Sequence, residues 1–348
     1  MLTNSVKKPK IGGTGQELQS LINTAMALGL TEITIQGTWT ITSPLVITSR
    51  ANRDIFKIKG INATMVNNVE NGTMLKFISS NVTIWDRIEI RDIKIISTLY
   101  PVNSDCIHIA GGCFGGGIYN CYIGGRNGSN LIKGSAVTFE SDHEDFGLTK
   151  NFEIYGCKIW FLSDYGLITR SANSTPAYIT INKSDIEMCG LGGIVGGYES
   201  IVIKESIIAY NGKTNSGGGI NLAGVISYAR NVTITDCGFE HNAGSHIVLD
   251  RLTNVKIETN TMMGLANGVN GFNCDSAIKC LGAYGVLNMQ IENNRIESVK
   301  EGYKGILANE KVKTIIDNMN QFVFNNGTAR EYASSIKVVG LKEDGTMF

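Results

Sequence analysis

ARNVTITDCGFEHNAGSHIVLDRLT, residues Ala229 to Thr253, contains the pattern that decides the fold. Apolar and polar residues alternate in two short runs around Ile234 and Phe239, an Asn-Gly-rich turn follows, and a third run covers His246 to Asp250. Alternation with a period of two is typical of β-strands, and Asn and Gly are typical of tight turns. The stretch therefore predicts a unit of strand, bend, strand, turn and strand.

The third strand of this unit recurs along the chain at intervals of roughly 25 to 30 residues, which is the range of a solenoid coil. Each copy begins with a small or polar residue and continues with apolar residues at alternate positions. The predicted copies are Cys106–Ala110, Ala136–Glu140, Gly166–Arg170, Gly193–Gly197, Gly219–Ala223, His246–Asp250, Ala277–Leu281, Gly305–Asn309 and Ser335–Val339. One such unit cannot bury its apolar face alone, but stacked units can. The sequence therefore predicts an all-β parallel β-solenoid.

A second class of strand, bent in its middle, precedes the copies; its segments begin at Ile118, Ile154, Ile181, Ile203, Ile234, Ile257 and Ile291. Alignment places Cys121, Cys157 and Cys237 in one column, with Ser184 or Asp185 and Ser206 nearby. Free cysteine is among the most buried residue types, and no Cys-x-x-Cys spacing is present. We interpret the column as an interior ladder of small residues and expect no metal site and no cofactor.

The N-terminal part predicts one helix, Thr14 to Leu28, with Gly29 as its C-terminal glycine. We expect one domain over residues 1–348: a cap over 1–50, solenoid rungs over about 51–339 and a tail over 340–348. The formal net charge is zero, so no strong field argues for a nucleic-acid partner. No apolar run is long enough for membrane insertion, and the first residues do not have the pattern of a secretory signal.

After the helix, GTWTITSPLVI at Gly37 to Ile47 is similar to the "G-x-Y/W-x-I-x-x-P-L-x-I" segment that opens many pectin-lyase-like right-handed parallel β-helices. With the rung series, the chain most resembles the bacteriophage tailspike branch of that superfamily, whose receptor-binding proteins often depolymerise polysaccharides. The resemblance implies a homotrimer, a bacterial surface polysaccharide as ligand, other virion proteins as partners and a place on a virion. Such a protein is made in the host cytoplasm; a bacterial relative would be secreted.

The chain also departs from the superfamily's patterns. GGTGQE stands where an Asp-rich "D-G-x-x-D-D-T" start is common, and the polygalacturonase signatures are absent. No cluster of aspartates offers the calcium site that pectate lyases use. Pectin is therefore not the expected substrate.

A first candidate site follows from the rung alignment of the bent strands. Glu187 and Glu240 fall two rungs apart, roughly 10 Å by backbone, which side chains can shorten to the roughly 6.5–9.5 Å between the carboxyl groups of inverting glycosidases. Trp160 and Tyr210 would stack on sugar faces. His241 would hold a carboxylate or a sugar hydroxyl. The alternative interpretation is a solvated face with scattered charges and aromatic rings.

A second candidate region lies at the ends of the third strands. Glu140 and Arg170 fall on neighbouring rungs and are positioned to pair, whereas His108 is predicted to point outward without a partner. Here the candidate catalytic residues are Glu140 and Asp142, and the candidate substrate-binding residue is Arg170. Just beyond Glu140, the acidic loop SDHEDFG includes Asp142, and loops on rigid scaffolds often hold functional residues. The alternative is a polar loop without chemistry.

Three functions remain open from the sequence. The first is a trimeric, tailspike-like enzyme, a glycoside hydrolase or polysaccharide lyase that degrades a bacterial polysaccharide. The second is a receptor-binding spike of the same fold without catalysis. The third is a non-viral β-helix carbohydrate-active enzyme. The sequence does not separate hydrolysis from elimination, or a site within one chain from a site between subunits.

Overall fold

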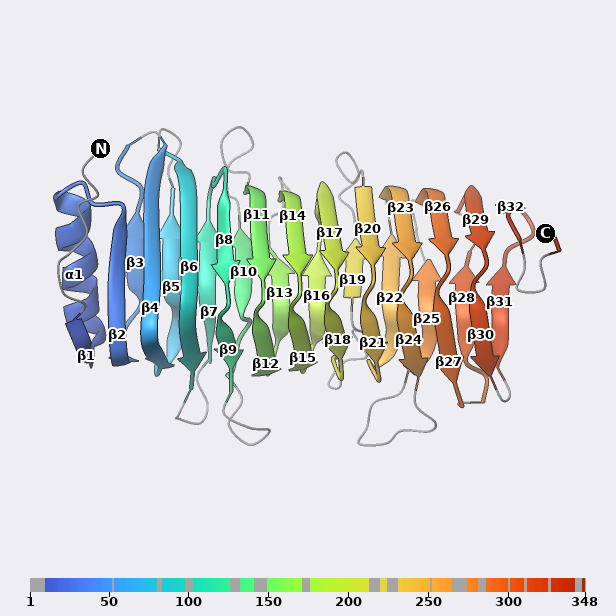
Figure 1. The fold of residues 1–348 in the computed structure, drawn as a ribbon, viewed down its shortest axis with the longest axis horizontal. Coiled ribbons are helices and arrows are strands. Elements are labelled where there is room, and N and C mark those ends of the chain that lie inside the picture. The colour runs from blue at the N-terminus through green and yellow to red at the C-terminus, as the bar shows by residue number, and fades with distance from the viewer. Residues whose placement is uncertain are drawn as a thin grey trace. The chain divides into compact units, whose positions relative to one another are not determined.

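A computed structural model (Figure 1) describes the chain as short parallel β-strands that coil in rungs, with one helix near the N-terminus of the described part. It describes residues 10–51, 53–79, 83–97, 103–125, 132–140, 149–170, 176–212, 220–223, 231–250, 252–264, 274–280, 286–299, 301–309, 312–324, 327–341 and 346–347. The chain divides into two compact units, Met1–Ala177 and Tyr178–Phe348. The single domain expected over 1–348 stays a prediction.

The first unit is built from two sets of parallel strands, which we name sheet A and sheet B. Sheet A holds β1 (Lys10–Thr14), β2 (Glu32–Ile41), β4 (Asp54–Asn67), β6 (Trp85–Ile96), β8 (Gly116–Tyr119), β9 (Tyr122–Gly124), β11 (Lys150–Tyr155) and β12 (Lys158–Leu162). Sheet B holds β3 (Leu45–Thr48), β5 (Asn71–Ile78), β7 (Asn103–Ala110), β10 (Val137–Glu140) and β13 (Tyr165–Thr169). The strand β14 (Ala177–Asn182) begins at the last residue of this unit.

The second unit repeats this arrangement. Its sheet A strands after β14 are β15 (Asp185–Cys189), β17 (Ser200–Lys204), β18 (Ile207–Ala209), β20 (Asn231–Thr235), β21 (Gly238–Glu240), β23 (Leu252–Glu258), β24 (Thr261–Gly264), β26 (Val286–Glu292), β27 (Arg295–Ser298), β29 (Thr314–Asn318), β30 (Gln321–Phe324) and β32 (Lys337–Val339). Its sheet B strands are β16 (Gly192–Gly196), β19 (Ile220–Ala223), β22 (Gly244–Asp250), β25 (Cys274–Cys280), β28 (Lys304–Ala308) and β31 (Thr328–Tyr332).

The register of the strands confirms the alignment made from the sequence. In sheet B, Ile107 pairs with Val137, and Val137 pairs with Leu167. In the second unit, the apolar residues of the same slot also follow one another: Ile194, Ile220, Ile247, Ile278 and Ile306. In the second halves of the bent strands, one apolar residue per rung is fully buried: Ile159, Ile186, Ile208, Phe239, Met262 and Ile296. The parallel β-solenoid predicted from the repeat is thus the observed fold.

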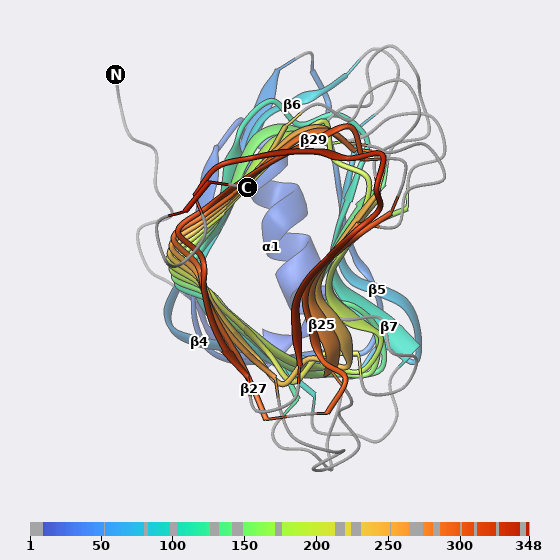
Figure 2. The same cartoon turned by 90° about the vertical axis from the view of Figure 1, so that its right-hand side faces the viewer.

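Helix α1 (Gly15–Ala27) lies across the end of the first unit's rungs (Figures 1 and 2). Thr14 is its N-cap and forms a capping box with Glu17, and Gly29 follows the helix at a φ of 71°. Leu18 and Ile22 are buried beneath it. The predicted cap is therefore confirmed, with the helix ending at Ala27 and its C-cap at Leu28.

Gln19 of this helix makes the hydrogen bonds that a neighbouring strand would make to β3. Its side-chain Nε2 donates to the Val46 carbonyl at 2.9 Å, and its Oε1 accepts from the Val46 amide at 2.8 Å. An edge strand with unpaired backbone groups is a template for association. The helix therefore satisfies this position of the β3 edge as well as covering the apolar interior.

Each bent strand turns at one residue in the left-handed region, such as Asp236 (φ 54°) or Asn293 (φ 53°). The next residue points inward, and these inward residues form a ladder: Cys121 and Cys157 in the first unit, and Ser184, Ser206, Cys237, Asn260, Asn294 and Asn320 in the second. All are buried, and the eight cysteines are free thiols. The cysteine and serine part of this ladder confirms the prediction, with Ser184 and not Asp185 in the column.

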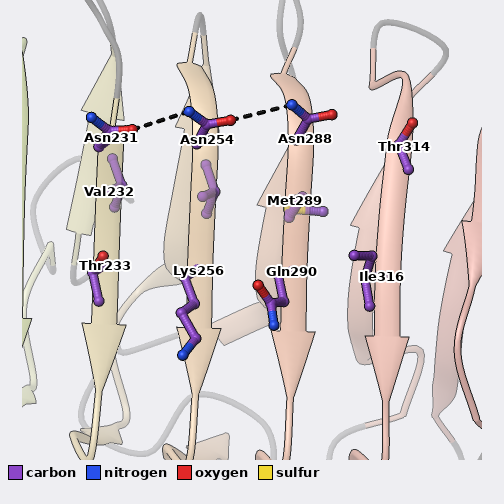
Figure 3. Close-up of a pocket in the computed structure, with 11 residues that line it drawn as sticks. Asn231, Val232, Thr233, Asn254, Lys256, Asn288, Met289, Gln290, Thr314 and Ile316 are labelled. Atoms are coloured by element: carbon purple, nitrogen blue, oxygen red, sulfur yellow. Dashed lines mark hydrogen bonds between the residues drawn. The ribbon is translucent and has the colours of Figure 1, made fainter.

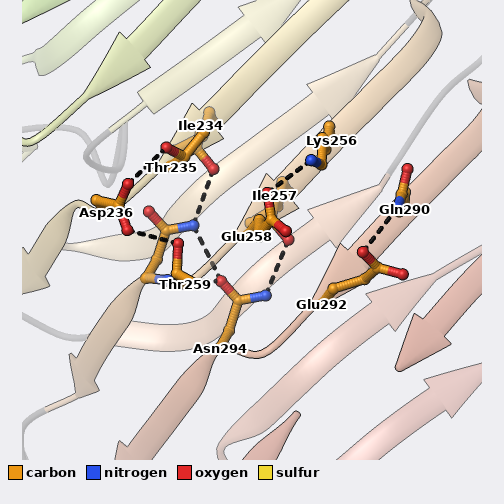
Figure 4. Close-up of polar contacts among 11 residues, drawn as sticks. Ile234, Thr235, Asp236, Lys256, Ile257, Glu258, Thr259, Gln290, Glu292 and Asn294 are labelled. Atoms are coloured by element: carbon orange, nitrogen blue, oxygen red, sulfur yellow. Dashed lines mark hydrogen bonds and ion pairs between the residues drawn. The ribbon is translucent and has the colours of Figure 1, made fainter. Parts of the chain in front are cut away.

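The asparagine part of the ladder, Asn260, Asn294 and Asn320, was not predicted. Asn294 Nδ2 donates to the Ile257 carbonyl at 3.0 Å (Figure 4). It also donates to Asn320 Oδ1 at 2.9 Å, and Asn294 Oδ1 accepts from the Asn260 backbone amide at 3.0 Å. Each amide thus satisfies backbone groups that the bend leaves without a strand partner. Buried polar groups are tolerated when they are hydrogen-bonded in this way.

The predicted final copy, Ser335–Val339, is wrong in its class. The strand β32 pairs with β29 in sheet A, and β31 is the last strand of sheet B. In β31, Arg330 occupies the slot that Ile306 holds one rung earlier, and its Nε lies 2.5 Å from Oδ2 of the fully buried Asp317. The predicted pattern requires an apolar residue at this position, so it does not recognise β31, where Arg330 of an ion pair stands instead.

Candidate functional site

A polar hollow of the first unit lies on sheet B and is named here the β7–β10 pocket. It has a volume of about 340 Å³ and is lined by Gly72, Thr73, Lys76, Ser104, Asp105, His108, Gly134, Asp164 and Arg170. Strand pairing brings these residues together, since Lys76 of β5 is in register with His108 of β7, and His108 with Thr138 of β10. A lysine, a histidine and a threonine therefore stand side by side at equivalent positions of three neighbouring strands.

Asp105 is the anchor of the pocket and is only 6% exposed. Its carboxylate accepts hydrogen bonds from the Ser135 backbone amide at 2.8 Å and the Thr138 hydroxyl at 2.9 Å. Arg170 Nη1 lies 2.9 Å from Asp105 Oδ2, and Nη2 lies 3.4 Å from Oδ1. These contacts hold the Arg170 guanidinium, which is partly exposed, at the edge of the pocket.

His108 is a buried imidazole at the centre of the pocket, with its residue 5% exposed. Its Nε2 lies 2.7 Å from Glu140 Oε2, but without the angle of a hydrogen bond, so Nε2 has no hydrogen-bond partner among the described residues. Burial lowers the pKa of His108; the Glu140 and Asp105 carboxylates oppose this shift, whereas Lys76 and Arg170 add to it. The ring is therefore neutral at neutral pH and lies against a carboxylate whose side chain is 34% exposed.

The second candidate region of the sequence is thus partly right and partly wrong. Glu140 and Arg170 do lie on neighbouring rungs. However, Glu140 is in ionic contact with His108, and Arg170 pairs with Asp105; both partners are residues of β7. The expectation that His108 has no partner is wrong, because its side chain, although it points outward from sheet B as predicted, is buried against Glu140. Asp142 lies outside the described residues.

Two members of the pocket, Asp105 and Lys76, were missed in the sequence. The copies were aligned from Cys106 onward, one residue after Asp105, and the β5 strand that holds Lys76 was not recognised as a copy. The sequence does indicate β5: MLKFI at Met74–Ile78 has apolar residues at the same alternate positions as CIHIA at Cys106–Ala110.

The first candidate site has the predicted register. Glu187 pairs with Ala209 and Ala209 with Glu240, so the two glutamates are two rungs apart in the second unit. The Tyr210 and His241 rings pack edge to face with centroids 5.1 Å apart. Burial raises the pKa of Tyr210, and the charges of Glu240 and Glu187 add to this shift. Burial lowers the pKa of His241, and Glu240 opposes it.

The remaining predicted residue of that site, Trp160, belongs to the first unit. Its ring lies 6.4 Å from the Tyr122 ring and 6.3 Å from the Phe161 ring, in edge-to-face contact with both. Its indole Nε1 is buried without a hydrogen-bond partner among the described residues. The catalytic roles predicted for Glu187 and Glu240 stay predictions.

A smaller hollow of about 260 Å³ lies on the outer face of sheet A in the second unit (Figure 3). Three asparagines on neighbouring strands form a row across it: Asn254 Nδ2 donates to Asn231 Oδ1 at 3.1 Å, and Asn288 Nδ2 donates to Asn254 Oδ1 at 3.2 Å. Lys256 is the titratable residue of its lining, and Lys256 Nζ lies 2.6 Å from Glu258 Oε2. The hollow offers amides for binding but no group suited to proton transfer.

The described residues contain no helix that is long and apolar enough to cross a membrane. They also contain no group of three or more His, Cys, Asp or Glu side chains arranged to hold a metal ion.

Comparison with known proteins agrees with the fold. Residues 146–280 match the family model described as a right handed beta helix region. The crystal structure of PfbA, a surface adhesin of Streptococcus pneumoniae, is similar over 97% of this chain and 94% of that chain, with a TM-score of 0.53 and 14% sequence identity. No curated protein matches the sequence. At this identity the likeness shows the right-handed parallel β-helix, and membership of the tailspike branch stays a prediction.

Proposed function

We propose that this right-handed β-helix protein binds a bacterial surface polysaccharide and cleaves it at the β7–β10 pocket. The observation that carries the proposal is the buried, neutral His108 in contact with Glu140 beside a polar cavity. A neutral imidazole accepts a proton at physiological pH. A carboxylate next to it stabilises the charged ring that results. The pair is therefore suited to general acid–base catalysis, which typically contributes about 10²–10⁴-fold to a rate.

The cations of the pocket point to an acidic sugar. Arg170 and Lys76 line the same cavity as His108, and an arginine fork matches the geometry of a carboxylate. In β-elimination, His108 would take the proton beside the carboxylate of a uronic acid. The electrons of that C–H bond would form a ring double bond as the bond to the next sugar's oxygen breaks. That oxygen would leave with the electron pair of the broken bond and take up a proton from water. The two cations would stabilise the negative charge that develops on the carboxylate.

Hydrolysis is the second candidate, and the carboxylates of the pocket favour it. Asp164 lines the cavity and accepts a hydrogen bond from Ser163 Oγ at 2.8 Å, and Glu140 contacts His108. One carboxyl group would protonate the leaving oxygen while the other activates water, as in glycoside hydrolases that use two carboxylates.

Purified protein incubated with bacterial capsular and O-antigen polysaccharides and with polyuronates tests the proposal. Products are followed by mass spectrometry and by the ultraviolet absorbance of an unsaturated uronide, which elimination forms and hydrolysis does not. We expect His108→Gln and Glu140→Gln to lower the turnover number by roughly 10²-fold or more, with the fold unchanged by circular dichroism. Glu187→Gln and Glu240→Gln serve as matched controls, because they remove equal charges from the second unit.

The outcomes separate the candidate sites. Cleavage lost in the second-unit variants and kept in the pocket variants would move the site to Glu187 and Glu240. Cleavage kept in all four variants would leave the Asp142 loop as the candidate. Binding of a polysaccharide without cleavage would make the protein a receptor-binding or adhesive spike and would contradict the catalytic part of the proposal.

The proposal also includes the setting implied by the resemblance of Gly37–Ile47 and the rung series to phage tailspikes. In that setting the chain is a homotrimer on a virion, and its polysaccharide is the receptor on the host surface. A non-viral β-helix enzyme that acts on the same class of polymer is the alternative, and the oligomeric state helps to separate the two.

A further inference from the structure

Outside the pocket, cations and aromatic rings alternate on the outer face of sheet A in the first unit. We name four of these residues, Lys94, Tyr122, Lys158 and Trp160, the lysine–aromatic strip. Lys94 of β6 is in register with Tyr122 of β9, and Tyr122 with Lys158 of β12. Neighbouring rungs are about 4.8 Å apart. The two lysines therefore stand on either side of a tyrosine, two rungs apart on a rigid ladder.

The rings and ammonium groups of the strip are in contact. Lys94 Nζ lies 5.3 Å from the centre of the Tyr122 ring, and Lys158 Nζ lies 5.2 Å from a Trp160 ring centre. The Tyr122 and Trp160 rings meet edge to face at 6.4 Å. Cation–π contacts of this kind hold long, flexible lysines in place. The strip is thus a pre-ordered surface.

The charges of the strip are not neutralised within the described residues. Both lysines are exposed, and neither has a carboxylate within 4.0 Å among the side chains that the structure describes. The nearby buried Glu89 is already surrounded by Lys57, Arg87 and Arg91. Arg91 also lies over the Tyr119 ring at 4.9 Å, which continues the pattern along β6 and β8.

We propose that the lysine–aromatic strip is a second glycan-binding surface, separate from the β7–β10 pocket, that holds an acidic polysaccharide. Half-exposed aromatic rings offer flat apolar faces to the C–H surfaces of sugars. Unpaired ammonium groups beside them select polymers that carry carboxylates. The inference shares with the proposed function only the class of ligand, an acidic polysaccharide. The strip can bind such a polymer whether or not the pocket cleaves it.

Binding of polygalacturonate, alginate and hyaluronate to the full chain at low salt tests the inference, with dextran as a neutral polymer and single-stranded DNA as a non-sugar polyanion. We expect binding of at least one polyuronate, no binding of dextran, and weaker binding as salt screens the charges. The double variant Lys94→Glu/Lys158→Glu should bind that polymer roughly tenfold more weakly or worse. Lys337→Glu, on the exposed strand β32, is the matched control and should bind normally.

The result separates the strip from the pocket. If the double variant still cleaves short oligosaccharides at the normal rate but binds polymer weakly, the strip is confirmed as a distinct surface. If no acidic polymer binds, or the double variant binds as the native chain does, the inference is wrong, whatever the activity of the pocket. Equal binding of DNA, lost in the same variant, would show a general polyanion surface and would contradict a glycan site.

Discussion

His246 illustrates how strongly the interior of this solenoid acts on a single residue. The side chain is fully buried in the second unit. Its Nδ1 lies 3.2 Å from Asn242 Nδ2, and its Nε2 lies 3.7 Å from Cys274 Sγ. Burial, with a smaller contribution from the His241 charge, lowers the pKa of His246 to about 3. Unfolding returns the ring to water, where its pKa is about 6.5.

The stability of the protein should therefore fall in mild acid. Below about pH 6.5 the unfolded chain binds a proton at His246 that the folded chain does not, so each pH unit toward 3 costs about 1.4 kcal/mol. Between pH 6.5 and 5 this amounts to about 2 kcal/mol. Denaturant unfolding of native protein and His246→Gln at both values checks the prediction. The variant should lose less stability on acidification, and an unchanged pH slope would contradict it.

The same linkage applies to His108 in the first unit, where burial also lowers the pKa. Glu140, Lys76, Asp105 and Arg170 are the charged groups that act on it. His246→Gln therefore leaves a residual acid sensitivity. In the proposed mechanism this lowered pKa keeps His108 ready to accept a proton, at the expense of stability in acid.

At the scale of an element, the bend in each rung depends on one inward side chain. In the inner ladder, Asn294 satisfies two backbone groups of one neighbouring rung, the Ile257 carbonyl and the Asn260 amide, through both atoms of its amide. In the outer row, Asn288 also donates to an asparagine one rung away, but its side chain is exposed. Both rows consist of hydrogen-bonded asparagine side chains, but Asn294 is buried and Asn288 is exposed.

This pair of residues makes a matched test. Asn294→Ala would leave buried backbone groups without partners, each at a cost of about 1–3 kcal/mol, so we expect a total loss of about 2–4 kcal/mol in the free energy of unfolding. Asn288→Ala should change it by about 0.5 kcal/mol or less, because water replaces the lost bond. Denaturant titration of the two variants measures both values. Equal losses would mean that the inner amides do not stabilise the bend.

At the scale of the whole molecule, the proposed homotrimer is open to direct measurement. Sedimentation equilibrium of the native protein should give three times the mass of one chain, at all concentrations tested. A stable trimer supports the spike setting, although enzymes of this fold also form trimers. A monomer at high concentration would contradict the virion part of the proposal and favour the non-viral enzyme, without affecting the test of the pocket.

The fold was largely predictable because each rung of a solenoid repeats the same alternation of apolar and polar residues. Ile107, Val137 and Leu167 repeat one inward slot, and their alignment alone indicated the register that the structure shows. The rung with Arg330 and Asp317 escaped notice because an ion pair replaces two apolar residues there. A repeat is recognised in a sequence by residues of the same chemical type at equivalent positions. This rung keeps the strand pairing, but charged residues stand at positions that are apolar one rung earlier.

The site was less predictable for a different reason. The alignment places Glu140 beside Arg170, but long side chains also reach diagonal neighbours. Asp105, which is fixed by two donors from Ser135 and Thr138, holds Arg170. Rung spacing specifies which backbones are adjacent. It does not specify side-chain rotamers, or that a residue on an outer face such as His108 will be buried.

Gln19 has a consequence for the way such a molecule stops growing. A stack of parallel rungs has the same hydrogen-bonding geometry along its axis as an amyloid filament, whose tip recruits each new chain through unsatisfied backbone groups. At the β3 edge, one side-chain amide already occupies the donor and the acceptor of Val46, and helix α1 offers no further strand to copy. In terms of polymer growth, helix α1 acts as a terminator at this end of the first unit, because it blocks the addition of a further strand.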